Sequence, residues 1–179
     1  MKNNENANKN VDKNSDMHLV INIAQQALTL YQYDKKIAQY AVSTAKNGIG
    51  SQQDSGCTPL GAHVIAQKIG GDAPINAVFV GRVPTGEIYD DALGKQYPER
   101  DWILSRILWL SGLEEGYNKG CNAQGGCDTY QRYIYIHGTP DTEPMGVARS
   151  HGCVRMRNDD IVALFAQVKE GTPVSIVAA

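Results

Sequence analysis

The chain has 179 residues, of which 42% are hydrophobic and 20% charged, and its formal net charge is −2. This length suits one domain with a substantial core, and the composition is that of an ordinary globular protein. The near-neutral charge, with no basic block, argues against nucleic acid or an anionic membrane surface as the main partner. No apolar run reaches the roughly 18 residues of a membrane-spanning helix, so no membrane span is expected.

Residues 1–16 differ in composition from the rest of the chain. They include six Asn and three Lys, with Met1, Ala7 and Val11 as the only apolar side chains. Because so little apolar surface cannot offset the entropy of ordering, this segment is expected to be a disordered polar tail, followed by one domain over 17–179. The tail lacks the apolar stretch of a secretory signal. We therefore expect a cytoplasmic protein if Met1 is the native start, and a periplasmic one if the chain has been trimmed.

Period-two alternation of apolar residues predicts strands through most of the domain. A polar turn at 34–36 separates two of them, and loops rich in Gly and polar residues are expected at 46–56 and 114–129. The run 102–110 is assigned to a strand because of its β-branched and aromatic content, and His63 is expected on the surface of its strand. The expected strands are 18–24, 27–33, 37–44, 63–69, 77–80, 102–110, 132–136 and 172–177.

One helix is predicted late in the chain, at about residues 159–169. Ile161, Leu164, Phe165 and Val168 recur at helical spacing, Asn158 or Asp159 is expected as the N-cap, and a glycine follows the last turn. The predicted fold is therefore mainly β, a sandwich or open barrel with one late helix.

Residues with catalytic chemistry gather between His137 and Arg155. Cysteine attacks as a thiolate, but an ordinary thiol has a pKa of about 8.5, so a nearby histidine must lower that pKa or take the proton. Cys153 follows Ser150, His151 and Gly152. The backbone N–H groups of Gly152 and Cys153 are candidates to hold a developing oxyanion.

Two further cysteines, Cys121 and Cys127, flank a Gly-rich stretch. Such a loop is flexible enough to close a small disulfide, whereas a reducing cytoplasm favours two free thiols. Both alternatives remain open from the sequence. The position of the loop just before the His137 strand suggests an active-site lid.

The segments Ile136-His137-Gly138-Thr139 and Ser150-His151-Gly152-Cys153-Val154-Arg155-Met156 resemble the L,D-transpeptidase (YkuD-like) catalytic family. Val42-Ser43-Thr44 and Thr58-Pro59-Leu60-Gly61 also resemble the N-terminal half of that family, so the resemblance extends from about Leu19 to Val177. The common family pattern has Asn two positions after the cysteine, where this chain has Arg155.

The resemblance implies a YkuD-like fold and a cysteine-dependent attack on a peptidoglycan stem tetrapeptide or muropeptide. Cys153 would attack the carbonyl between a diamino acid, usually meso-diaminopimelate, and D-alanine, releasing D-alanine and leaving a thioester.

His137 would be the base, oriented by the carbonyl of Gly138. His151, Gly152 and Cys153 would line the oxyanion site, with Ser150 supporting it. Tyr135, Thr139 and Arg155 would bind substrate, Arg155 as an anchor or a brace.

The molecule that accepts the acyl group determines which reaction the enzyme catalyses. Water gives an L,D-carboxypeptidase that trims tetrapeptides during recycling, which the absent signal segment favours. An amine gives an L,D-transpeptidase that forms cross-links or exchanges D-amino acids. Carbapenem-type inhibitors are expected to react with Cys153, and no cofactor or metal is expected.

Two other classes of protein are alternatives to this enzyme. A zinc protein would use His137, His151, Cys153 and a loop cysteine, but the close ligand spacing typical of zinc sites is missing. A non-catalytic binder of wall peptides would have no use for Cys153 and His137 together.

Overall fold

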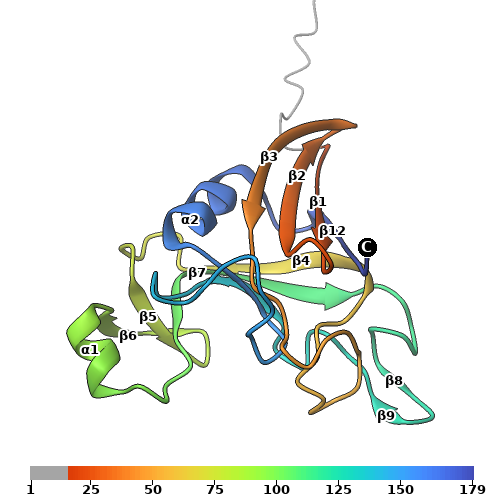
Figure 1. Ribbon diagram of the computed structural model, residues 1–179. Helices are drawn as coiled ribbons and strands as arrows, with labels where there is room; N and C mark the ends of the chain where they lie inside the picture. The colour runs from red at the N-terminus through yellow and green to blue at the C-terminus, as the bar shows by residue number, and fades with distance from the viewer. Residues whose placement is uncertain (1–15) are drawn as a thin grey trace, which may run out of the picture.

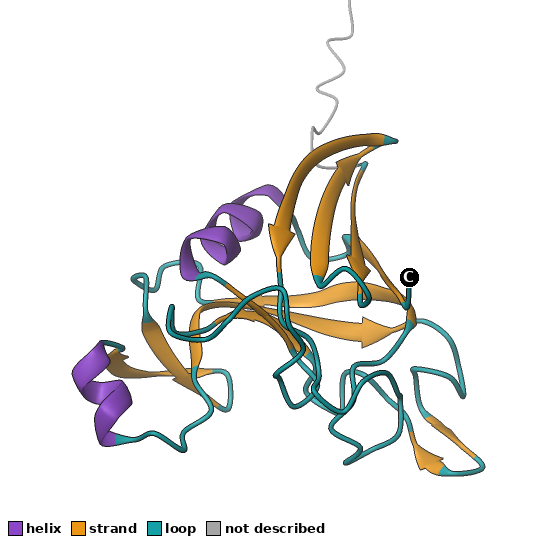
Figure 2. Ribbon diagram, viewed as in Figure 1, coloured by secondary structure: helices purple, strands orange, loops and turns teal. Residues whose placement is uncertain are grey.

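The computed structural model describes residues 16–179, so the tail expected at 1–16 lies, apart from Asp16, outside the described residues. The described chain is mainly β with two helices (Figure 2). The elements in order are β1 (Met17–Asn22), β2 (Ala27–Gln32), β3 (Lys35–Ala41), β4 (Gly61–Ile69), β5 (Ala77–Val80), β6 (Val83–Ile88), α1 (Asp91–Gln96), β7 (Ile103–Gly112), β8 (Cys121–Asn122), β9 (Gly125–Gly126), β10 (Tyr135–Gly138), β11 (Val154–Met156), α2 (Asn158–Gln167) and β12 (Pro173–Val177).

One large sheet forms the body of the domain, in the order β11-β10-β7-β4-β12-β1-β2-β3, with β5 and β6 branching from β7 (Figure 1). The two ends of this order meet. Just beyond β3, Ser43 and Arg155 of β11 exchange both backbone hydrogen bonds, at 3.0 and 2.9 Å. The sheet therefore curls round into the open barrel that the strand pattern predicts.

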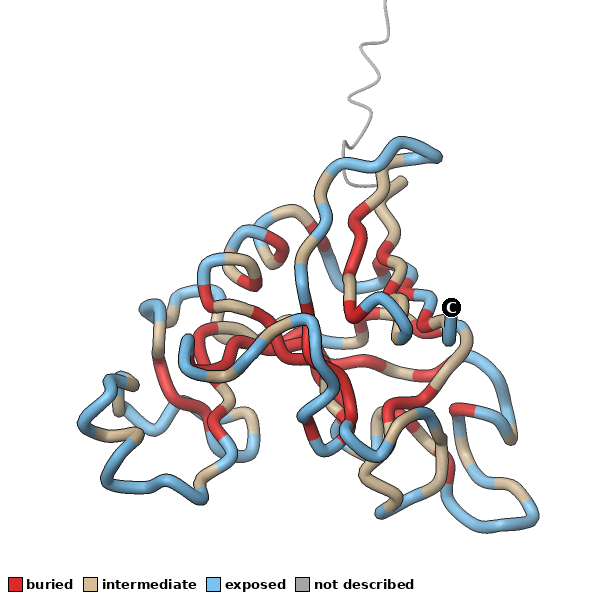
Figure 3. The backbone as a smooth tube through the Cα atoms, in the orientation of Figure 1, coloured by how far each residue is buried: buried red, intermediate tan, exposed pale blue. Residues whose placement is uncertain are grey.

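The main core lies inside this curl and is filled by the alternating residues of facing strands. Leu19 and Leu28 come from β1 and β2, Leu108 from β7, and Ile161 and Leu164 from α2; all five are 0% exposed. Burying one such side chain is worth about 1.5–3 kcal/mol. Buried stretches follow the central strands, whereas α1 and the tip of the β8–β9 hairpin are exposed (Figure 3).

The predicted strands are present, with shifted ends. The first turn is Tyr33–Asp34, not 34–36, because Tyr33 adopts a positive φ of 52° and β3 starts at once at Lys35. The strand expected at 132–136 is β10, which begins only at Tyr135, since Tyr130–Tyr133 form a turn. β6 and α1 were missed; neither has a buried apolar pattern, as α1 buries no residue.

The late helix is present, but the predicted cap is wrong. α2 begins at Asn158, and Arg157 is its N-cap without a side-chain hydrogen bond. The side chain of Asn158 instead turns into the protein, donating to Thr139 O at 2.9 Å and accepting from Ser105 Oγ at 2.6 Å. Two buried hydrogen bonds therefore replace the solvent-side capping bond that the sequence suggested. None of the helices in the described residues is long and apolar enough to cross a membrane.

The loop 114–129 contains the small β8–β9 hairpin. Cys121 pairs with Gly126 in this hairpin, and Cys127 directly follows β9. Cys121 is exposed, Cys127 is buried, and both are free thiols in this structure.

His63 is buried, not on the strand surface as expected. It is 1% exposed, with Nδ1 3.0 Å from Gly61 O and Nε2 3.1 Å from Thr129 Oγ1. Burial, opposed by the Gly61 carbonyl, lowers the pKa of His63 to about 4. The alternation of β4 placed this residue correctly on one face, but that face is covered by the segment that carries Thr129.

This burial predicts an acid-sensitive fold. Because the unfolded chain binds a proton at His63 below its ordinary pKa of about 6.5, the stability due to neutral His63 is complete above pH 6.5. It is lost as the pH falls toward 4, by about 3 kcal/mol for this residue. Urea unfolding of the wild type and of His63→Gln at pH 7 and pH 4.5 measures this loss of folding free energy. The variant, which cannot ionise, should lose clearly less stability between the two pH values; equal losses would contradict the prediction.

Candidate active site

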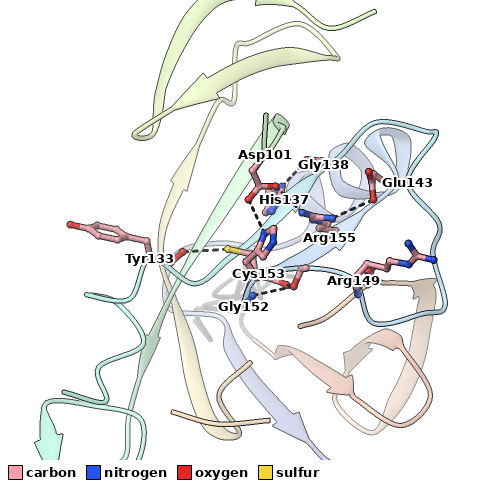
Figure 4. Close-up of polar contacts among 12 residues, drawn as sticks. Asp101, Tyr133, His137, Gly138, Glu143, Arg149, Gly152, Cys153 and Arg155 are labelled. Carbon is pink, nitrogen blue, oxygen red and sulfur yellow. Dashed lines mark hydrogen bonds and ion pairs between the residues drawn. The ribbon is translucent and has the colours of Figure 1, made fainter. Parts of the chain in front are cut away.

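Strand pairing brings the two predicted catalytic segments together. β10 and β11 are parallel neighbours, with His137 opposite Arg155, and Cys153 directly precedes β11. Cys153 and His137 line one cavity of about 450 Å³, together with Ser150, His151 and Arg155. Figure 4 shows the side chains of His137, Cys153 and Arg155 close together. His137 and Cys153, which are 16 positions apart in the chain, thus supply the imidazole and the sulfur to one cavity.

The sulfur of Cys153 is half-buried and held by backbone groups. Tyr135 N–H donates to Sγ at 3.3 Å, and the thiol donates to Tyr133 O at 3.4 Å (Figure 4). Burial raises the pKa of Cys153 to about 12, although the Tyr135 N–H opposes this effect by favouring the thiolate. The thiol is therefore protonated at neutral pH and needs a base.

His137 has the properties of that base. It is 1% exposed, and its Nδ1 lies 2.7 Å from the carbonyl oxygen of Gly138. Burial lowers the pKa of His137, so the ring is neutral at pH 7. Since a carbonyl only accepts, Nδ1 carries the proton, and Nε2 keeps a free lone pair.

Gly138 is required for this arrangement. A Cβ at position 138 would lie 2.5 Å from Asn158 Oδ1 and 2.6 Å from Leu104 O. No real side chain tolerates such distances, so only glycine lets the carbonyl approach His137 here.

The turn before Cys153 is fixed by Ser150. Its hydroxyl donates to Cys153 O at 2.5 Å and accepts from Gly152 N–H at 3.2 Å. Gly152 adopts a φ of +136°, a conformation that favours glycine. Of the two N–H groups expected at the oxyanion site, that of Gly152 is therefore occupied. That of Cys153 makes no hydrogen bond within residues 16–179.

Arg155 is a brace between two carboxylates. Its side chain is 9% exposed and lies 2.7 Å from Asp101 Oδ1 and 3.4 Å from Glu143 Oε2. Asp101 Oδ2 also lies 3.7 Å from His151 Nδ1 (Figure 4). Both terminal nitrogens of the Arg155 guanidinium are thus paired with carboxylates of this protein. Sequence reasoning missed Asp101 and Glu143, because neither has a spacing that links it to the cysteine motif.

A second cleft adjoins the first. It has a volume of about 330 Å³, and Asp101, His151 and Arg155 line both clefts. Thr139 lines the second cleft and Tyr135 the first, although both are at most 5% exposed, so each presents only a small surface. His151 is exposed between the two.

The loop 114–129 does not cover the site. None of its residues lines either cleft, and Gln53 N–H instead donates to Gly126 O at 2.7 Å. The expectation of a lid is therefore wrong, since the loop packs beside the 46–56 loop. Among the described residues, no group of three or more His, Cys, Asp or Glu side chains is placed to hold a metal ion.

Together the fold and the site bring a thiol and a buried, neutral imidazole to one cavity, the two groups that nucleophilic acyl transfer by a cysteine requires. The chain matches the YkuD family, the L,D-transpeptidase catalytic domain, over residues 16–176. It therefore belongs to the L,D-transpeptidase catalytic domain family.

Known relatives agree with this assignment. The chain is 31% identical over 107 residues to the putative L,D-transpeptidase YkuD of Bacillus subtilis, a match covering 56% of this chain and 63% of the relative. It is also 48% identical over 46 residues to the probable L,D-transpeptidase YbiS of Escherichia coli K12, covering 26% of this chain but only 15% of that relative.

Solved structures share the fold. The L,D-transpeptidase from Mycobacterium smegmatis superposes with a TM-score of 0.54 at 16% identity, over 91% of this chain and 59% of that one. The L,D-transpeptidase LdtMt1 in complex with imipenem also gives 0.54, at 18% identity, over 90% of this chain and 59% of that one. The mainly β fold with a late helix is thus confirmed.

The raised pKa of Cys153 predicts how the thiol reacts with a simple alkylating agent. Because the thiolate fraction keeps growing up to a pKa of about 12, alkylation by iodoacetamide should still accelerate between pH 8 and pH 10. Mass spectrometry of the Cys153 peptide measures the rate, with exposed Cys121 as an internal comparison. A rate for Cys153 that is flat from pH 7 would instead indicate a preformed thiolate–imidazolium pair.

The carboxylates around Arg155 predict the effect of restoring the common family residue. Arg155→Asn leaves Asp101 and Glu143 without their partner and should lower the free energy of unfolding by about 2 kcal/mol, measured in urea at low salt. Arg157, which lies 3.9 Å from Asp141 with a 36% exposed side chain, is the control. Arg157→Gln, which adds no strongly preferred capping side chain at this N-cap position, should cost about 0.5 kcal/mol. Equal losses would show that Arg155 has no special role as a brace.

Proposed function

We propose that this domain is a cysteine-dependent L,D-peptidase that acts on peptidoglycan stem tetrapeptides through Cys153. The sulfur attacks the carbonyl between the diamino acid and the terminal D-alanine. His137 takes the thiol proton as the C–S bond forms and the carbonyl oxygen becomes an oxyanion. It passes that proton to the departing amine when this tetrahedral intermediate collapses and the C–N bond breaks. Free D-alanine leaves, and the remaining tripeptide stays on the enzyme as a thioester.

The observation that carries this proposal is the shared cavity of Cys153 and His137, with the imidazole held by Gly138. A thiol with a raised pKa beside an imidazole with a lowered pKa is a neutral pair at pH 7. Proton transfer therefore accompanies attack, and His137 acts as a general base. The free N–H of Cys153 is available for the oxyanion that forms at the attacked carbonyl.

Two acceptors lead to two outcomes. Attack by water gives an L,D-carboxypeptidase, which releases the tripeptide. Attack by an amine of a second stem gives an L,D-transpeptidase. The second cleft favours this alternative, because it meets the Cys153 cavity at His151 and Arg155 and offers room for a second chain.

A β-lactam tests the nucleophile. Because a similar structure is a complex with imipenem, we expect imipenem to acylate Cys153, opening the β-lactam C–N bond and adding the whole drug mass. Cys153→Ala should add nothing, and His137→Gln should slow acylation by about 100-fold or more. Intact-mass spectrometry gives the adduct and its rate. Absence of an adduct on the wild type would favour a non-catalytic binder of wall peptides.

Product analysis distinguishes the acceptors. The purified protein is incubated with a diaminopimelate tetrapeptide, with and without an added D-amino acid. Tripeptide alone indicates the carboxypeptidase, whereas a linked dimer or an exchanged tetrapeptide indicates the transpeptidase. Cys153→Ala should give none of these products.

A further inference from the structure

The carbonyl that precedes the nucleophile is held by a residue from a distant part of the chain. Thr58 is 0% exposed, and its hydroxyl donates to Gly152 O at 2.9 Å. It lies on the segment 45–58, which runs beside the 149–155 segment: Ala45 bridges Ser150, and Lys46 N–H donates to Ser150 O at 3.0 Å. This contact therefore links the Thr58 loop directly to the peptide bond before Cys153.

Because the peptide bond is planar, the hydrogen bond from Thr58 to Gly152 O also sets the direction of the Cys153 N–H. In a trans peptide, the C=O and the following N–H point in opposite directions within one plane. Because Gly152 C=O points at Thr58, the N–H of Cys153 points away from the 45–58 segment. No residue of that segment lines the cavity that holds Cys153 and His137. The N–H is therefore directed to the side on which the cavity lies.

Thr58 is itself held firmly. Ala45 N–H donates to Thr58 Oγ1 at 3.0 Å, and Thr58 N–H donates to Gly48 O at 3.0 Å. Arg132 Nη2 donates to the preceding carbonyl of Cys57 at 2.7 Å. Since Oγ1 already accepts from Ala45, its own proton is free to be directed at Gly152 O.

The Gly152 carbonyl needs such a partner because glycine can adopt many backbone conformations. Gly152 has no Cβ and adopts a φ of +136°, so local sterics hold its peptide plane weakly. The Gly152 N–H is already bound by Ser150 Oγ, whereas the Cys153 N–H makes no hydrogen bond within the described residues. A rotation of this one plane would remove that donor from the cavity.

We infer that Thr58 is a positioning residue that aims the Cys153 N–H at the oxyanion of the reaction. This role rests on the proposed acyl transfer at Cys153. Thr58 touches neither the substrate nor the sulfur; it acts through the Gly152–Cys153 peptide. Attack on a carbonyl or β-lactam develops an oxyanion and depends on this donor, whereas displacement by the same sulfur on iodoacetamide develops none.

The test compares these two reactions at Cys153 in Thr58→Val, which keeps the shape but lacks the hydroxyl, and in Thr58→Ser, which keeps the hydroxyl. Imipenem acylation should slow by roughly 10- to 100-fold in Thr58→Val and by less than about 3-fold in Thr58→Ser. Alkylation of the Cys153 peptide by iodoacetamide should stay within about 2-fold of the wild type in both, because the thiol remains in place.

A matched control separates positioning from loss of stability. Thr129 is also 0% exposed, its hydroxyl donates to Asn118 O at 2.9 Å, and it lines neither cleft. Thr129→Val removes this buried bond and the contact of Thr129 Oγ1 with His63 Nε2, and it should lower the melting temperature without slowing acylation. If Thr58→Val does not fold, Thr58→Ala compared with Thr58→Ser answers the same question.

The outcomes are distinct. Slowed acylation with unchanged alkylation, restored by serine, supports the role of Thr58. Equal slowing of both reactions, or no slowing of either, overturns it. A wild type that takes up no imipenem overturns the proposed function, and with it this role of Thr58.

Discussion

The structure depends on the backbone seam between the segment after β3 and the segment that carries the nucleophile. Ser43 and Arg155 exchange two backbone hydrogen bonds there, and Ala45 pairs with Ser150 on the same seam. Because these bonds join the two ends of the sheet order, they close the barrel around its core. The same bonds hold the turn before Cys153, so closure of the fold and geometry of the site have one physical cause.

The electrostatics of the site follow from this enclosed position. Burial disfavours charge on both Cys153 and His137, so the pair rests in its neutral state. The nearby permanent charge of Arg155 is paired with the carboxylates of Asp101 and Glu143. In the proposed reaction, activation is therefore left to substrate binding, when the base, the thiol and the Cys153 N–H act on the same carbonyl.

Much of the fold could be predicted because the strands carry a strong alternating pattern. Leu28 and Leu30 of β2 lie in the core as expected, and the apolar stripe of α2 faces it as well. Failures arose where a tertiary contact outweighed a local preference. Asn158 left its capping position for Ser105 and Thr139, and His63 was covered by the segment that bears Thr129. The sequence did not predict α1 and β6, because these elements bury too few apolar side chains to produce a periodic hydrophobic pattern.

By itself, the sequence determined the family, the mainly β class and the residues that meet at the cavity, because motif and alternation are local and were visible along the chain. Only the tertiary structure decided what each residue contacts. It engaged Arg155 with Asp101 and Glu143, gave the Gly152 N–H to Ser150, and placed Thr58 against the Gly152 carbonyl. These partners are up to 94 positions apart in the chain, and nothing local encodes such a distance. They meet because the barrel closes, and closure is a property of the whole sheet.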